Sequence, residues 1–175
     1  TRNWNDGKGF EPSSLNDEAQ FTGSFDGKEY AIEGLYINRP DNDEVGLFSD
    51  IDGAVIKNLE INNYSILGNN ECASIAGHAY HEYLLENIRS RGELTFSLRS
   101  GGIIGYPYHS NGTMKNCMFQ GEITGVAGVG GIVGFNLGST IENCYSVVAI
   151  SGVEDGRGYG GITGRNDGTI KNCYS

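Results

Sequence analysis

Three histidines and four tyrosines gather in two neighbouring segments, each of which follows a glycine, Gly77 or Gly105. Counted from these glycines, Tyr80 aligns with Tyr108 and His81 aligns with His109. Aromatic rings with polar tips suit the recognition of sugars or peptides, so the pattern predicts a ligand-binding loop patch on the surface. An ordinary loop whose rings cover the underlying sheet is the alternative. The predicted patch consists of His78, Tyr80, His81, Tyr83, Tyr106, Tyr108 and His109.

The same segments do not complete a catalytic motif. His81-Glu82 begins a zincin-like pattern, but Leu85 stands where that pattern needs its second histidine. Glu82 is the one carboxylate near the two segments in sequence. We therefore predict no catalytic residues, no cofactor and no metal, with a transition-metal site on His78, His81 and His109 as an alternative.

Acidic residues between Asp41 and Asp52 could gather a calcium ion. The stretch departs from the EF-hand loop because its fifth position is Val45 and the terminal glutamate is missing. A solvated acidic turn is the expectation here.

Composition excludes several classes of partner. Lys and Arg number 12 and Asp and Glu number 22, which gives a formal charge of −10. Such a chain lacks the basic surface that nucleic acids or anionic membranes require, and no apolar run is long enough for membrane insertion. With 28 Gly and only 3 Pro, the composition favours a β-rich fold with many tight turns.

A repeat positions these residues. An asparagine recurs at steps of 29, 29, 27 and 29 residues, and a glycine-containing apolar block precedes each occurrence. Short apolar runs separated by Gly, Asn, Asp and Ser predict strands and turns, with a loop or a turn of helix over Ala79 to Arg91. We predict an all-β fold, a parallel β-helix (solenoid) of about six coils of roughly 28 residues each. The recurring residues are Asn58, Asn87, Asn116, Asn143 and Asn172.

Equivalent positions have matching chemistry, as stacked coils require. The residue after each asparagine is apolar or cysteine, which predicts an inward column ending in the buried thiols Cys117, Cys144 and Cys173. The residue before it is charged with alternating sign, which predicts an outward column. The asparagines predict a buried amide ladder, in which Asn116→Ala would cost about 1–3 kcal/mol.

Two segments resemble the GLUG-type repeat. They are Gly-Gly-Ile-Val-Gly-Phe-Asn…Ile-Glu-Asn-Cys-Tyr-Ser at 130–146 and Gly-Gly-Ile-Thr-Gly-Arg-Asn…Ile-Lys-Asn-Cys-Tyr-Ser at 160–175. Upstream, Phe21-Thr22-Gly23-Ser24-Phe25-Asp26-Gly27 is similar to the coil that opens such repeats, so the resemblance covers roughly residues 21–175. Similar repeats occur in bacterial adhesins and in the N-terminal β-helical regions of immunoglobulin-A-cleaving zinc metallopeptidases. The resemblance implies a right-handed β-helix with a non-catalytic role, extracellular or on the bacterial cell surface.

These observations predict one β-helix domain over 1–175, with a lead-in at 1–20, an opening coil at 21–44 and GLUG-like coils at 45–175. Because the chain stops inside a repeat, we expect a fragment of a longer protein whose open ends allow end-to-end or edge association. The predicted function is that of a structural or adhesive module that presents loops to a glycan or a host surface protein. The alternatives are a polysaccharide-processing β-helix enzyme and an accessory domain of a secreted metallopeptidase.

Overall fold

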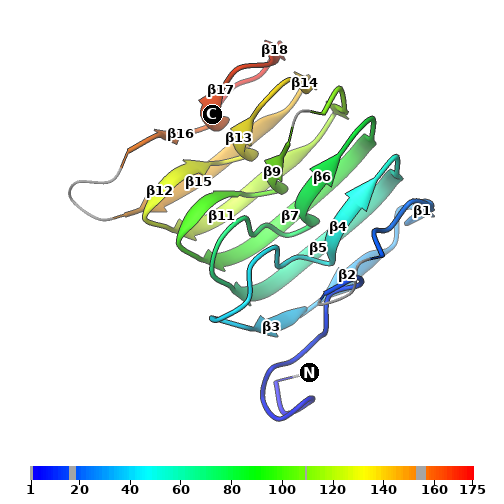
Figure 1. Cartoon of the computed structure of the whole chain (residues 1–175), viewed down its shortest axis with the longest axis vertical. Coiled ribbons are helices and arrows are strands. Elements are labelled where there is room, and N and C mark those ends of the chain that lie inside the picture. Colours follow the sequence, from blue (N-terminus) through cyan, green and yellow to red (C-terminus); the bar gives the residue numbers. More distant parts are fainter. Residues whose placement is uncertain (1, 16–18, 109, 153–156) are drawn as a thin grey trace.

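The computed structural model describes residues 2–15, 19–108, 110–152 and 157–175. Within these residues the chain forms a parallel β-solenoid, in which strands of successive turns lie side by side (Figure 1). Leu85 pairs with Ile56 on one side and with Met114 on the other, and Met114 pairs with Ile141, so a turn takes 27 to 29 residues. Six strands stacked in this column enclose about five turns, so the predicted parallel β-helix is confirmed with one coil fewer than the six expected.

The described strands belong to three sheets that wrap around one core. The long sheet has ten strands, in which one stack runs the length of the molecule and shorter strands flank it. The stack is β1 (Ser24–Asp26), β5 (Val55–Leu67), β7 (Leu84–Thr95), β10 (Thr113–Lys115), β14 (Thr140–Glu142) and β18 (Thr169–Lys171), flanked by β2 (Ala31–Glu33), β3 (Tyr36–Asn38), β11 (Met118–Thr124) and β15 (Tyr145–Ser151).

The two shorter sheets form the other sides of the solenoid. The five-stranded sheet consists of β4 (Phe48–Asp52), β6 (Ala76–Tyr80), β9 (Ile104–Pro107), β13 (Val133–Asn136) and β17 (Thr163–Asn166). The three-stranded sheet consists of β8 (Leu98–Gly101), β12 (Ala127–Gly130) and β16 (Tyr159–Gly160).

Columns of equivalent residues build the core, as the repeat predicts. The position after each ladder asparagine points inward, and Leu59, Ile88, Cys117 and Cys144 are all buried there. The cysteines are free thiols, and burial raises the pKa of Cys117. On the outer side, Glu86 pairs with Lys57 and with Lys115, so the predicted column of alternating charge is present. Opposite charges on neighbouring turns favour this register over a slipped one.

Two local expectations are wrong. Residues 79–91 contain no turn of helix, because most of the segment belongs to β7, where burial alternates as in a strand with one face on the core. Phe48 and Gly77 each stand ten residues before a ladder asparagine, so the repeat predicts that they pair across neighbouring turns. Phe48 pairs with Ala76 rather than with Gly77.

The lead-in and the last turn lie at the two ends of the stack. Isolated bridges join Gly9 to Ile37 and Ser13 to Phe48, so described residues of the lead-in pack against the first turns. Among the described strands, β16, β17 and β18 pair on one side only. End-to-end or edge association at these strands stays a prediction. No described segment forms a helix of the length and hydropathy that a membrane span needs.

Candidate functional site

Aromatic rings cluster on the five-stranded sheet, where β6 carries His78 and Tyr80 and β9 carries Tyr106, so these residues do not form the predicted loops. His78 on β6 pairs with Tyr106 on β9, and Ala79 pairs with Pro107, which places Tyr80 in register with Tyr108. The His78 and Tyr106 rings stack with centroids 5.2 Å apart, and the Tyr106 and Tyr108 centroids are 5.5 Å apart. We call His78, Tyr80, Tyr106 and Tyr108 the aromatic patch.

The remaining residues of the predicted loop patch do not all join this cluster. The side chain of His81 is 79% exposed and its Nδ1 lies 2.7 Å from Asp52. Tyr83 is only 5% exposed, and its hydroxyl donates to Ser139 Oγ at 3.0 Å. The prediction that Tyr83 lies on the surface is therefore wrong. His109 lies outside the described residues.

A glycine one turn further on explains why Tyr83 turns inward. A Cβ atom at Gly112 would overlap the Tyr83 ring, so the missing side chain makes room for the ring inside the solenoid. The hydroxyl then needs a buried partner, and Ser139 supplies it. A glycine that aligns with a tyrosine of the preceding turn could therefore have indicated from the sequence that the tyrosine is buried.

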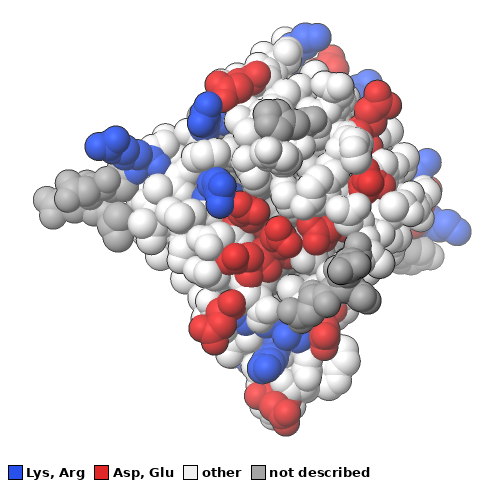
Figure 2. Space-filling model, in the orientation of Figure 1, with Lys and Arg blue, Asp and Glu red and all other residues white. Residues whose placement is uncertain are grey.

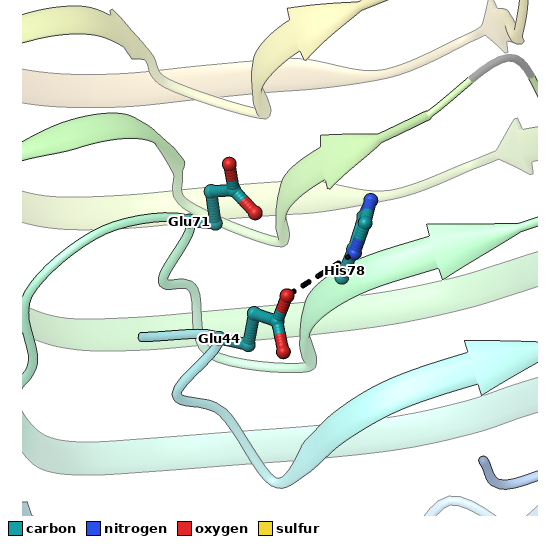
Figure 3. A group of neighbouring side chains, drawn as sticks. All are labelled: Glu44, Glu71 and His78. Carbon is teal, nitrogen blue, oxygen red and sulfur yellow. Dashed lines mark ion pairs between the residues drawn. The ribbon is translucent and has the colours of Figure 1, made fainter. Parts of the chain in front are cut away.

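His78 is buried beneath a group of carboxylates that sequence analysis did not bring together. Its Nδ1 lies 3.4 Å from Glu44 Oε1 and 3.6 Å from Asp50 Oδ1, and one ligand atom each of Glu44, Glu71 and His78 lies within 4.8 Å of the others (Figure 3). Asp and Glu side chains gather over the middle of this face in Figure 2. We call Glu44, Asp50, Glu71 and His78 the acidic cluster. Asp41 and Asp43 are exposed, as a solvated turn requires, whereas Asp50 is buried, so the expectation of a solvated turn fails at Asp50.

Left-handed turns position the two glutamates. Glu44 and Glu71 both have φ near +57°, at the equivalent point of successive turns, before β4 and β6. A Cβ atom at Gly77 would overlap the backbone of Glu44, and one at Gly105 would overlap the backbone of Glu71. These glycines therefore let each glutamate turn pack directly against the strand of the following turn. That close approach brings both carboxylates to His78.

The electrostatics of the acidic cluster reflect burial and crowding of like charges. Burial, reinforced by the Glu44 charge, raises the pKa of Asp50 to about 6. The close approach of His78 holds the pKa of Glu44 below its usual range. Burial raises the pKa of Glu71, although Arg99 opposes this shift through an ion pair of 2.7 Å. Arg99 also lies 5.0 Å from the Tyr106 ring centroid, which joins the acidic cluster to the aromatic patch.

The predicted asparagine ladder is present on the opposite side of the molecule, on the long sheet. From Asn87 onward, each amide donates to the side-chain oxygen of the preceding asparagine, at 3.0 Å from Asn87 to Asn58 and 3.2 Å from Asn116 to Asn87. The bonds from Asn143 and Asn172 measure 3.4 Å and 3.3 Å. The ladder lies at the surface, so the expectation of a buried ladder is wrong. It borders an open groove of about 650 Å³, which Glu60 and Arg89 also line.

Chemically, the face of the five-stranded sheet offers two things. The aromatic patch presents ring faces and hydroxyls, with Tyr108 44% exposed, as suits a sugar or peptide. The acidic cluster brings carboxylate oxygens close to an imidazole, a set that can hold a proton or a metal cation. The nearest carboxylates to His78 thus come from neighbouring turns, and not from Glu82 as sequence order implied.

Comparisons with known proteins agree with the repeat architecture. The GLUG motif matches residues 125–151, within the turn that contains β12 to β15. A protein named Halomucin, from Haloquadratum walsbyi, is 41% identical over 105 residues, which are 58% of this chain and 1% of that protein. The chain therefore spans about 1% of the length of this relative. No solved structure matches the chain.

Proposed function

We propose that this chain is a non-catalytic structural module of a secreted or surface-anchored protein, which presents the aromatic patch to a glycan or a protein ligand. The observation that carries the proposal is the set of tyrosine rings on neighbouring turns, in which Tyr108 is 44% exposed and packs 5.5 Å from Tyr106 between ring centroids. Rings held on strands are presented without the ordering cost that a free loop would incur.

The location outside the cell is part of the same proposal. The GLUG motif at 125–151 and the name of the relative Halomucin, which describes a mucin-like protein, support it. The relative comes from an archaeon, so it lends no support to a bacterial source in particular. A rigid stack of turns suits a spacer that holds a binding surface away from its anchor.

A glycan-array screen of the purified chain tests the proposal. We compare wild type with Tyr80→Ala/Tyr108→Ala, and use Tyr30→Ala as the matched control because Tyr30 is 77% exposed outside the aromatic patch. The expected result is binding by wild type and the control, and a loss of about tenfold or more in the double variant, as for a stacked aromatic anchor.

Three outcomes would count against the proposal. Equal binding by the double variant would move the ligand site away from the aromatic patch. Turnover of a polyuronate to unsaturated products would establish the enzyme alternative, in which Asp50 and Glu44 are the nearest paired carboxylates. If wild type binds no ligand, the chain is a spacer without a ligand-binding site of its own.

A further inference from the structure

His78 is the unusual member of the acidic cluster. Its side chain is only 8% exposed, and neither ring nitrogen has a hydrogen-bond partner among the described residues. A buried imidazole without hydrogen-bond partners costs free energy, because both nitrogens have given up hydrogen bonds to water. The Nδ1 atom faces Glu44 (Figure 3), so the missing partner belongs between the imidazole and the carboxylates.

The spacing of these groups matches a metal ion. Ligands of a tetrahedral zinc ion lie about 3.3–3.6 Å from one another, because Zn–N and Zn–O bonds are about 2.0–2.2 Å long. His78 Nδ1 is 3.4 Å from Glu44 Oε1, and a Glu71 oxygen completes a group whose members lie within 4.8 Å. Arg99 fixes the Glu71 carboxylate through its Oε1, at 2.7 Å. Small side-chain adjustments would bring three ligands onto one ion.

Charge favours a cation at this point. Glu44, Asp50 and Glu71 bring three carboxylates to the acidic cluster, and Arg99 is the basic partner of one of them. With all carboxyl groups ionised, two negative charges stay uncompensated beside a buried ring. Asp50 Oδ1 is itself buried without a hydrogen-bond partner, at 3.6 Å from His78 Nδ1. A divalent ion would neutralise this excess and give His78 Nδ1 the partner that it lacks.

We propose that Glu44, Glu71 and His78 bind a divalent transition-metal ion of the zinc type, with Asp50 as the neighbouring buried acceptor. Imidazole nitrogen selects zinc and similar ions over calcium and magnesium, which prefer oxygen ligands alone. The Glu44 side chain is 35% exposed, which leaves a route for the ion to enter.

The ion would join two successive turns. Glu44 precedes β4, whereas Glu71 and His78 belong to the turn that contains β6. Binding would therefore stabilise the folded state and hold the His78 ring in place against Tyr106. The site does not depend on the proposed function, because it is detected by metal binding and not by recognition of a glycan.

Titration of the metal-free chain with Zn²⁺ tests the site, by calorimetry and by thermal unfolding at rising Zn²⁺ concentration. We expect one ion per chain and a melting temperature that rises with free Zn²⁺. His78→Gln should weaken binding at least about tenfold. The matched control is His81→Gln, because His81 also faces one carboxylate but lies outside the acidic cluster. It should bind Zn²⁺ within about twofold of wild type.

Further variants keep the test decisive. If His78→Gln does not fold, as judged by circular dichroism, Glu44→Gln replaces it, because Glu44 is only half-buried and its loss should weaken binding by a similar factor. Absence of stoichiometric Zn²⁺ binding would overturn the proposal, as would equal affinity of the cluster variant and wild type. Thiolate charge-transfer absorption with Co²⁺ would also overturn it, by assigning the ion to a cysteine such as Cys173.

Discussion

At the residue scale, buried hydroxyls are matched by serines from other turns. Tyr64 Oη lies 2.8 Å from Ser90 Oγ, and Ser90 in turn donates to Ser74 at 2.8 Å. Tyr83 donates to Ser139, whose hydroxyl lies 2.8 Å from Ser110. Each phenol thus keeps a partner after it leaves water, which is what allows a tyrosine into an otherwise apolar core.

These phenols predict a stability that falls in alkali. Burial raises the pKa of Tyr64 and of Tyr83 above the ordinary value near 10, so the folded state holds both protons where the unfolded state releases them. The free energy of unfolding should fall as pH rises above about 10, by about 1.4 kcal/mol per pH unit for each phenol. Burial also raises the pKa of Cys72 to about 12, which adds a decline of the same sign.

Urea unfolding between pH 8 and 11 measures this slope. Tyr83→Phe should cost about 1 kcal/mol at pH 8, through the lost hydrogen bond, and should make the decline above pH 10 shallower. Tyr30→Phe is the control, since Tyr30 is exposed and should leave both quantities unchanged. An unchanged alkaline slope in Tyr83→Phe would mean that this phenol titrates normally.

At the element scale, two columns of left-handed residues turn the chain from one strand to the next. The ladder asparagines have φ between 50° and 55°, a conformation that asparagine tolerates better than most residues. The other column contains Glu44, Glu71 and Arg99, and continues with Gly128 and Gly158. The first column gives a ladder of amides, whereas the second brings charged side chains over the five-stranded sheet.

Two substitutions of Asn116, which lies between β10 and β11, distinguish how much backbone strain and how much the ladder hydrogen bonds contribute to the free energy of unfolding. Asn116→Ala should lower the free energy of unfolding by about 1–2 kcal/mol, because alanine is strained at a φ of 54°. Asn116→Gly relieves that strain and removes the same bond to Asn87, so it should cost less than half as much. Thermal or urea unfolding of both variants measures the difference. Equal losses would assign the stability to the amide ladder itself.

The same two columns show what sequence could and could not predict. The asparagine column repeats one residue type, so its place, its bonds and the inward cysteines beside it follow from the repeat. The acidic cluster lacks such a signal, because Glu71 and Arg99 occupy equivalent positions with opposite charge. Its one hint is spacing, since Glu71, Arg99, Gly128 and Gly158 each precede the glycine of the next strand by six residues. A column that accepts glycine marks a left-handed turn, but only packing shows what its side chains meet.

At the scale of the whole molecule, the parallel stack makes neighbours of residues one turn apart. Both candidate sites depend on this arrangement, since His78 meets Tyr106 across 28 residues and Glu44 across 34. The period and the register of the long sheet could be read from the sequence, because every turn carries the asparagine block. The sequence did not show which of the predicted loop residues turn inward. Tyr83 does so because a glycine of the next turn leaves space for its ring.

A nuclear Overhauser map of the isotopically labelled chain tests the parallel stacking of the turns most directly. The stack predicts backbone contacts of Leu85 with Ile56 and with Met114, and of Met114 with Ile141, at separations of 27 to 29 residues. Antiparallel contacts within one repeat, in place of these, would contradict the solenoid and both sites built on it.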